Sequence, residues 1–321
     1  MTEPLGDEYD RPRPAKSGPV RVRVPAKINL YLQVGPLRPD GYHDLTTVYQ
    51  AISIHDELTA RPGDTLTLTM EGEGTGQLPL DETNLAIRAV RALAAFTGHP
   101  AHARLHLRKQ IPIAGGLAGG SADAAAALVA CDALWQTNLA RDELADIASA
   151  IGSDVPFLVL GGTALGTGRG ERVSPVLASA HTWHWVVAIA DYGLSTPAVY
   201  AELDRLRDGA ARTGAGWFAD AGPPEALLAA LRQRDPDVLA AALANDLQAA
   251  ALSLRPVIGD TLDAGIEAGA LAGFVSGSGP TCVFLASDVR HAAAISTALA
   301  ESGTCHHVRT AAGPVAGARV A

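Results

Sequence analysis

The sequence predicts an α+β fold built from two domains. Its 321 residues are 48% hydrophobic, which is enough chain for two ordinary domains that each bury a core. Strand patterns and Ala-rich helical runs fill the first half, whereas the second half is expected to run strand, helices, two strands, helix and strand. That last order is a split βαβ order with extra helices inserted. We therefore place the domain boundary within residues 171–180.

The first strand patterns follow a polar start. Residues 1–18 mix Pro, Gly and charges without periodicity, which is typical of a disordered tail. Arg21–Val24 alternates polar and apolar residues, and Ile28–Val34 is apolar enough for a second strand. Lys27 and Asn29 lie two residues apart, so an extended chain presents both on one face. Taken alone, such a pair is more typical of a solvated edge strand.

Hydrophobic periodicity predicts the other elements of the first half. Strands are expected at Thr46–Ile54, Leu66–Met70 and Ala103–Leu107, and helices at Asn84–Phe96, from the glycine-rich loop to Trp135, and at Arg141–Ile151. A turn at Pro39-Asp40-Gly41 precedes Tyr42 and His43. Asp154 lies in a loop, and the apolar run Phe157–Leu160 after it is expected as a strand.

The second half carries the split βαβ pattern. Strands are expected at Trp183–Asp191, near Phe274, at Cys282–Ala286 and at Cys305–Ala311, and helices at Pro197–Arg207, Pro224–Gln233, Pro236–Leu252, Pro256–Ala268 and Val289–Glu301. The turn Gly277-Ser278-Gly279-Pro280 joins two of the strands. The expected domains are residues 19–175 and 176–314, followed by a tail at residues 315–321.

A glycine-rich loop precedes the longest Ala-rich run. Its glycines are Gly115, Gly116, Gly119 and Gly120, and without side chains the backbone can adopt positive φ and approach a ligand closely. Ser121 and Asp123 then lead into the helical run 124–130. The free N–H groups of a loop that feeds a helix start, together with the helix dipole, favour a phosphate.

Three familiar loop types do not fit this stretch. No Lys-Ser/Thr pair follows the last glycine, as a Walker A loop requires, and no G-x-G-x-x-G occurs in the chain. Asp123 stands where a nucleophile elbow needs glycine, which argues against an esterase.

Composition excludes several other classes. The net charge is −9 with 18% charged residues, which argues against nucleic-acid or anionic-membrane partners. Three widely spaced cysteines indicate neither a disulfide framework nor a zinc site, and favour a reducing cytoplasm. Cys305-His306-His307 is a poor metal clip because adjacent residues of an extended segment point to opposite faces. No apolar run approaches the roughly 20 residues that span a bilayer.

Three sequence blocks occur in a fixed order. They are Pro25-Ala26-Lys27-Ile28-Asn29-Leu30, the loop at residues 112–125, and Gly277-Ser278-Gly279-Pro280-Thr281. Together they resemble the three motifs of the GHMP kinases, which phosphorylate small molecules. The resemblance implies the two-domain GHMP kinase fold, with an N-terminal ribosomal-protein-like α/β domain and a C-terminal ferredoxin-like split βαβ domain.

Three shorter segments narrow the resemblance. Arg38-Pro39-Asp40-Gly41-Tyr42-His43, the segment at residues 152–156 and Ser195-Thr196-Pro197 look like family members of the non-mevalonate isoprenoid pathway. Those members transfer the γ-phosphate of ATP to the 2-hydroxyl of a cytidine-diphosphate-linked methylerythritol. The likeness runs from about Val20 to the last strand.

The resemblance places a catalytic pair at Asp154 and Lys27. A hydroxyl that attacks phosphorus needs an acceptor for its proton, and the negative charge on the transferred group needs a cation. Without the other motifs, Asp154 would more often be a simple turn cap. The family motifs reverse that preference.

The resemblance also implies the ATP site. Asn84 and Lys109 fall near the adenine, and the residues expected around the phosphates are Pro112, Ala114, Gly115, Gly116, Leu117, Ala118, Gly119, Gly120 and Ser121. Gly277 and Gly279 would help to close the site. The family loop usually has glycine and serine where this chain has Ala118 and Ala122, so one backbone position is less free and one hydroxyl is missing. Mg²⁺ is implied together with ATP, and no ligands are assigned to it.

On the acceptor side, the resemblance implies a cytosine pocket. Tyr42 and Tyr200 fall where the family sandwiches the base, and His43 falls where it reads the base edge. Asn29 and Thr196 match residues that line the substrate site. Stacking suits any flat base, so hydrogen bonds must select cytosine.

Two alternatives stay open. One is a GHMP kinase acting on an uncharged sugar or a small acid, which would have little use for Tyr42, His43 and Tyr200. The other is a nucleotide-binding sensor without turnover, which would not need Lys27 and Asp154. In every case the expected partner is a small molecule, and the chain acts as a monomer or a homodimer.

Overall fold

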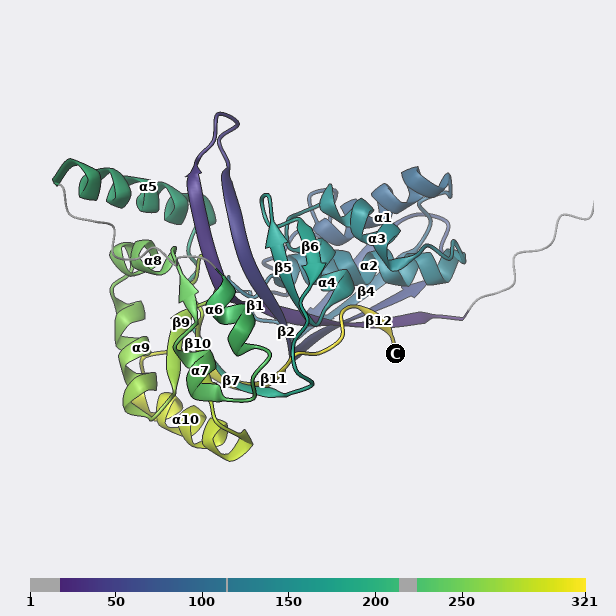
Figure 1. The fold of residues 1–321 in the computed structure, drawn as a ribbon. Helices are drawn as coiled ribbons and strands as arrows, with labels where there is room; N and C mark the ends of the chain where they lie inside the picture. The colour runs from purple at the N-terminus through teal and green to yellow at the C-terminus, as the bar shows by residue number, and fades with distance from the viewer. Residues whose placement is uncertain (1–17, 114, 214–223) are drawn as a thin grey trace, which may run out of the picture.

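The computed structural model describes residues 18–113, 115–213 and 224–321. The expected disordered tail at residues 1–18 falls outside these ranges except for Gly18. The described residues form an eight-stranded and a four-stranded sheet, with helices packed against both (Figure 1). None of their helices is long and apolar enough to span a membrane.

The first sheet is built around a long antiparallel hairpin. Its strands are β1 Val20–Leu37, β2 His43–Arg61, β3 Thr67–Gly72, β4 Arg104–Lys109, β5 Thr163–Thr167, β6 Arg172–Pro175, β8 Ala244–Asn245 and β12 Arg319–Val320. The main order is β12-β1-β2-β4-β3, while β5 also pairs with β2 and β8 runs parallel to β1. The associated helices are α1 Leu85–Thr97, α2 Gly119–Trp135, α3 Arg141–Ser149 and α4 Val155–Leu160.

The two short strands expected near the N-terminus form the single strand β1. Pro25 lies within it, where the register to β2 shifts between Pro25 and Ala26, and such irregularities accommodate proline. Lys27 and Asn29 do share a face, but they are 4% and 3% exposed. The interpretation as a solvated edge strand is therefore wrong, because β1 has neighbours on both sides.

The strand expected at Phe157–Leu160 is wrong, because these residues form the last four positions of helix α4. Pro156 occupies the first turn of this helix, where a missing N–H breaks no intrahelical hydrogen bond. Short apolar runs fit a buried strand and a buried helix equally well, so the sequence pattern did not distinguish them.

The second sheet has the expected split βαβ arrangement. Its antiparallel order β11-β7-β10-β9 uses β7 Trp183–Ile189, β9 Ala272–Val275, β10 Cys282–Ala286 and β11 His307–Gly313. The helices are α5 Thr196–Thr213, α6 Glu225–Ala230, α7 Pro236–Ala240, α8 Gln248–Leu254, α9 Val257–Glu267 and α10 Val289–Ser302. Figure 1 shows the β1–β2 hairpin rising between α1–α4 and the layer of α8–α10.

Two segments of the second half return to the first sheet. The single helix expected over Pro236–Leu252 is wrong: it is divided into α7 and α8 by β8, which pairs with Tyr31 and Leu32 of β1. Residues 315–321 contain β12, which pairs with the start of β1. Both halves of the chain therefore complete the sheet that carries Lys27 and Asn29.

The two sheets share one hydrophobic core. Trp185 of β7 is fully buried with residues of both halves, and its indole N–H donates to Gln50 Oε1 of β2 at 2.8 Å. The boundary between residues 175 and 176 separates β6 from β7, and it stays our proposal for the domain limit.

Candidate active site

A cavity of about 810 Å³ opens between the β1–β2 hairpin, the glycine-rich loop and the starts of α4 and α5. The residues predicted for the site that line it are Lys27, Asn29, Tyr42, His43, Lys109, Pro112, Gly115, Gly116, Ala118, Gly119, Gly120, Asp154, Thr196 and Tyr200. The structure thus brings together side chains that are as far apart as residues 27 and 200 in the sequence.

Among the predicted residues that the structure describes, Gly277 also lines the cavity, whereas Asn84, Leu117, Ser121 and Gly279 do not. Asn84 caps α1, since its Oδ1 accepts the Ala86 N–H at 2.9 Å. Leu117 is fully buried, and its backbone carbonyl accepts a hydrogen bond from the backbone N–H of Lys27 at 3.3 Å. Ser121 lies in the first turn of α2, and Ala114 lies outside the described residues. Their assignment to ATP stays a prediction.

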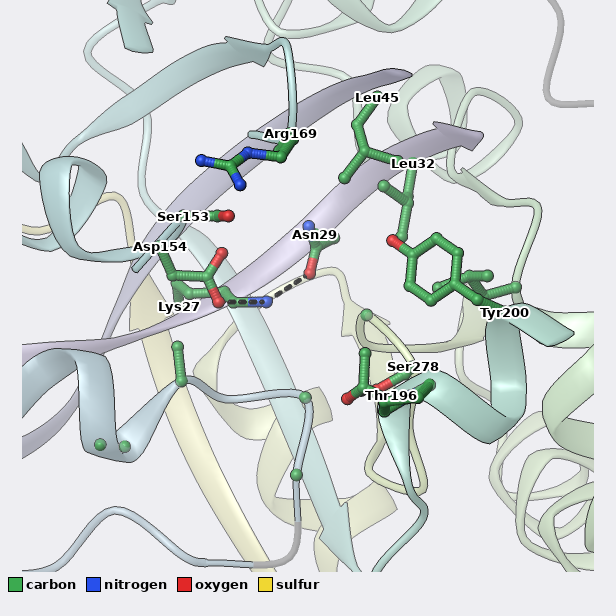
Figure 2. Close-up of a pocket in the computed structure, with 18 of the residues that line it drawn as sticks. Lys27, Asn29, Leu32, Leu45, Ser153, Asp154, Arg169, Thr196, Tyr200 and Ser278 are labelled. Atoms are coloured by element: carbon green, nitrogen blue, oxygen red, sulfur yellow. Dashed lines mark hydrogen bonds and ion pairs between the residues drawn. The ribbon is translucent and has the colours of Figure 1, made fainter. Parts of the chain in front are cut away.

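The predicted catalytic pair meets in the cavity. Lys27 Nζ lies 3.6 Å from Asp154 Oδ2 and donates to Asn29 Oδ1 at 2.7 Å, as Figure 2 shows. Asp154 occupies the N-cap position of α4 but makes no side-chain cap hydrogen bond. Its side chain is 28% exposed, whereas that of Lys27 is 5% exposed. An incoming hydroxyl can therefore reach the Asp154 carboxylate, whereas the Lys27 ammonium is buried beside it and held by Asn29.

The glycine-rich loop adopts the backbone that its composition predicts. Gly115 and Gly116 have φ of 98° and 82°, and Ala118 is also left-handed at 58°. A side chain at Gly115 would bring its Cβ to 2.7 Å from the Gly279 carbonyl, so the close approach of the two loops requires glycine. The left-handed Ala118 carries strain that glycine, usual in the family, would avoid.

The turn after β9 holds this loop from the other side. Thr281 Oγ1 donates to the Gly115 carbonyl at 2.8 Å, and Ser276 Oγ donates to the Gly116 carbonyl at 2.9 Å. Helix α2 then starts at Gly119 without a side-chain cap at Ala118. Its first N–H groups and its dipole therefore create positive potential at the cavity wall.

A buried charge cluster underlies the loop. Lys109 Nζ lies 2.6 Å from Asp56 Oδ2 and 2.7 Å from Asp123 Oδ2. Burial lowers the pKa of Lys109, but the charges of Asp123 and Asp56 outweigh it and the net shift is upward. Burial raises the pKa of Asp123 to about 8. The ammonium lies between the two carboxyl groups, and the cluster ties β2, β4 and α2 together.

The acceptor wall combines aromatic rings with a histidine. The rings of His43 and Tyr200 lie 5.1 Å apart, and His43 Nε2 lies 3.0 Å from Asp204 Oδ1. Burial, followed by the charge of Asp154, raises the pKa of Tyr200, so its hydroxyl stays neutral. Tyr42 is 53% exposed and offers its ring at the entrance.

Comparison with known proteins shows the family. The model described as GHMP kinases N terminal domain matches residues 84–162, and GHMP kinases C terminal matches residues 227–305. A protein of Salinispora tropica named 4-diphosphocytidyl-2-C-methyl-D-erythritol kinase is 70% identical over the full length of both chains. The chain belongs to this family of GHMP kinases. A namesake from Nocardia farcinica is 56% identical over 94% of this chain and 96% of its own.

Solved structures agree with this family. A crystal structure of 4-(cytidine 5'-diphospho)-2C-methyl-D-erythritol kinase has a TM-score of 0.71 and 31% identity, and covers 91% of this chain and 98% of its own. A crystal structure of homoserine kinase from Cytophaga hutchinsonii has a TM-score of 0.73 and 19% identity. It covers 97% of this chain and 100% of its own. The latter likeness shows the GHMP kinase fold alone.

Several residues of this GHMP kinase site were not predicted from the sequence. Tyr49 lines the cavity, and burial, then the charge of Asp154, raises its pKa well above the usual value. It pairs with Asn29 across the hairpin, but the register shifts twice between the turn and this pair. Counting back from the turn would therefore have pointed to Ala51 instead. Asp204 lies one helical turn after Tyr200, a spacing that also places it on the cavity side.

Two further residues escaped prediction because their partners are distant in sequence. Asn245 Nδ2 donates to the carbonyls of Val275 and Gly277 at 2.7 and 2.8 Å, which fixes the turn beside the glycine-rich loop. Arg169 lines the cavity from a loop that the sequence marks only as glycine-rich. No local pattern signals either contact.

Proposed function

We propose that this chain transfers the γ-phosphate of ATP to the 2-hydroxyl of 4-diphosphocytidyl-2-C-methyl-D-erythritol, a step of non-mevalonate isoprenoid synthesis. The observation that carries the proposal is the contact of Lys27 with Asp154, at 3.6 Å, in a cavity lined by both the glycine-rich loop and the aromatic wall. The names of relatives that are 53% to 70% identical support the choice of acceptor.

The donor phosphates would lie on the glycine-rich loop. Gly115, Gly116, Gly119 and Gly120 line the cavity without side chains, and their backbones and the start of α2 offer N–H donors and a positive dipole end. The hydroxyls of Ser276 and Thr281 hold the loop carbonyls, which keeps the loop in the shape that cradles phosphate. Binding therefore depends on backbone geometry more than on side-chain charge.

Asp154 would accept the proton of the attacking hydroxyl. Its carboxylate is reachable, and the Lys27 ammonium beside it balances negative charge that gathers as the phosphoryl group moves. Asn29 accepts one hydrogen bond from Lys27 and donates to Thr47 Oγ1 at 2.8 Å. This chain of hydrogen bonds fixes the direction of the ammonium before substrate arrives.

The aromatic wall would bind the cytosine. Tyr42 and Tyr200 offer faces for stacking, and His43 supplies a hydrogen bond to the base edge. Because Asp204 is an acceptor at 3.0 Å from His43 Nε2, that nitrogen carries the proton in the neutral ring. Nδ1 then remains as an acceptor, which suits the amino group of cytosine.

Mg²⁺ would enter with the phosphates of ATP. The described residues contain no group of three or more His, Cys, Asp and Glu that could hold a metal, but a phosphate-bound Mg²⁺ needs only one or two protein carboxylates. The carboxylates that line the cavity are Asp154 and Asp204, and Lys27 and His43 already contact them, so no protein ligand is assigned to the ion. When bound, the ion would neutralise phosphate charge.

The surroundings of the reaction are also proposed from composition. We infer a cytoplasmic enzyme, monomeric or homodimeric, that needs neither nucleic acid nor membrane. The net charge of −9 supports the absence of polyanionic partners.

The direct test is ADP release in the presence of ATP and Mg²⁺ with a panel of acceptors. The panel holds the cytidine-diphosphate methylerythritol, mevalonate, homoserine and galactose. We expect turnover with the cytidine compound alone. Turnover with another acceptor would assign the chain to a different GHMP kinase activity, and ATP binding without any turnover would favour a sensor.

A further inference from the structure

Arg169 occupies an anchored loop on the wall of the cavity. It lies in the turn between β5 and β6, between Gly168 and Gly170. The Gly168 carbonyl accepts the Leu45 N–H at 2.6 Å, which ties the loop to β2. A Cβ at Gly170 would collide with the Tyr49 hydroxyl, so the loop lies directly against the cavity wall.

The Arg169 side chain is directed into the cavity rather than along the surface. Figure 2 shows its guanidinium reaching across the space above Ser153 and Asp154. Its central carbon lies 4.9 Å from the ring centroid of Tyr42. The guanidinium thus contacts Tyr42, which is proposed to stack on the base, and lies on the side of the cavity that holds Asp154.

Within the described part of the chain, the charge of Arg169 faces an aromatic ring and no carboxylate. Of the cations that line the cavity there, Lys27 pairs with Asp154, and Lys109 pairs with two carboxylates. Arg169 makes no ion pair with a described carboxylate. Glu171, two residues on, accepts only its backbone N–H, at 2.6 Å. The cavity therefore holds one cation with its charge available for an anionic ligand.

We propose that Arg169 binds the diphosphate linker of the acceptor and so selects cytidine diphosphate compounds over uncharged ones. This inference rests on the proposed function. The diphosphate joins the base to the polyol, so it would run from the aromatic wall toward Asp154, past a guanidinium that contacts Tyr42 and lies above Asp154. A planar guanidinium binds two phosphoryl oxygens at once, and contact with Tyr42 holds it ready.

The test compares cytidine with cytidine diphosphate as ligands. Binding is measured by titration calorimetry with a non-hydrolysable ATP analogue saturating the donor site, so that neither ligand binds there. The proteins are wild type, Arg169→Gln and Arg172→Gln. Arg172 is the matched control, because it lies on the same hairpin, its side chain is 80% exposed, and it does not line the cavity.

We expect wild type and Arg172→Gln to bind cytidine diphosphate at least about tenfold more tightly than cytidine, as a charge-assisted contact of ~1.4 kcal/mol would give. Arg169→Gln should lose most of that preference and keep its affinity for cytidine. In wild type the preference should fall as salt is raised from 50 to 300 mM.

Other results would overturn the inference. Equal weakening of both ligands in Arg169→Gln would show that Arg169 acts only by holding Tyr42, and an unchanged preference would show that the linker is bound elsewhere. A wild-type protein that binds neither ligand would overturn the proposed acceptor itself, and this outcome is distinct from the other two.

Discussion

At the scale of single residues, the site depends on which charges are paired and which can be reached. Lys27 is 4% exposed and held by Asn29, whereas Asp154 keeps a partly open carboxylate. Lys109, equally buried, is enclosed by two carboxylates. The two lysines thus have different roles: Lys27 faces the proposed reaction, and Lys109 supports the loop from below.

Asp154→Asn tests the role of the open carboxylate. The amide keeps the size of the side chain but cannot accept the hydroxyl proton, so kcat should fall by about 10²- to 10⁴-fold. The KM for ATP should change little, because the phosphates are proposed to bind the glycine-rich loop. Steady-state kinetics checks both values. A kcat close to that of wild type would show that Asp154 does not accept the hydroxyl proton.

Asp123→Asn tests the buried charge cluster through its pH dependence. The pKa of Asp123 is raised from 3.8 to about 8 in the folded protein, so the native state holds this proton more tightly than the unfolded chain. The contribution of protonated Asp123 to the free energy of unfolding is therefore complete below about pH 4 and is lost as the pH rises toward 8. The loss has an upper limit of about 1.4 kcal/mol per pH unit.

Urea unfolding between pH 5 and 9 provides the measurement for that prediction. The free energy of unfolding of wild type relative to Asp123→Asn should decline up to about pH 8 and then level off, because the amide has no proton to lose in this range. Parallel curves for the two proteins would mean that Asp123 is ionised in the folded state throughout.

At the scale of elements, contacts distant in sequence connect the predicted motifs. Thr281 is fully buried, and its hydroxyl holds the Gly115 carbonyl at 2.8 Å. Asn245 fixes the same turn through two carbonyls. The second sheet therefore sets the shape of a loop that belongs to the first half of the chain.

Thr281→Val should loosen the glycine-rich loop. Valine keeps the shape but leaves the Gly115 carbonyl without its donor, which costs about 1–2 kcal/mol of stability. Because the freed carbonyl lets the loop move away from the shape proposed to bind phosphate, the KM for ATP should rise by roughly three- to tenfold. Steady-state kinetics and urea unfolding measure the two effects.

Thr261→Val provides the matched control for that variant. Thr261 is 6% exposed, and its hydroxyl donates to the Thr304 carbonyl at 2.9 Å, away from the cavity. It should lose similar stability with an unchanged KM for ATP. An equal rise in KM for both variants would show a general loss of stability rather than a role of the turn.

Periodicity predicted the elements that have a long repeating pattern. Helix α1 begins at Leu85 with Asn84 as its cap, within one residue of the expectation, and α10 and β10 are equally close to theirs. Two of the failures are short elements: α4 has six residues and β8 has two. Such lengths hold too few residues for a period to show, and tertiary pairing decides their form.

The candidate site was predictable to the extent that motifs carry it. The glycine-rich loop, Lys27 and Asp154 come from segments with a recognisable family pattern, and all of them meet in the cavity. Asp204 and Arg169 contact residues 161 and 127 positions away, and only the fold brings such pairs together. Sequence spacing therefore identifies the centre of this site better than its walls.

At the scale of the whole molecule, the two sheets depend on each other. Trp185 of the second sheet is buried with the first-half core and donates to Gln50. Strands β8 and β12 come from beyond residue 240 yet pair with β1. Figure 1 shows the C-terminal strand β12 returning alongside the first part of β1. Substrate and ATP would bind between parts that we expect not to fold separately.

A fragment of residues 19–175 should therefore fail to fold by itself. It contains the glycine-rich loop, Lys27 and Asp154, but it lacks β8, β12 and the indole of Trp185. Fully buried Ala318, whose N–H donates to the Leu158 carbonyl at 2.8 Å, is lost as well, so α4 loses a support beside Asp154. We expect the fragment to show no cooperative thermal transition by circular dichroism, while the full chain unfolds in one step. A fragment with a sharp transition and a native-like near-ultraviolet spectrum would instead mean that the first half is an independent domain, and that the contacts across residue 175 contribute to the active site but not to folding.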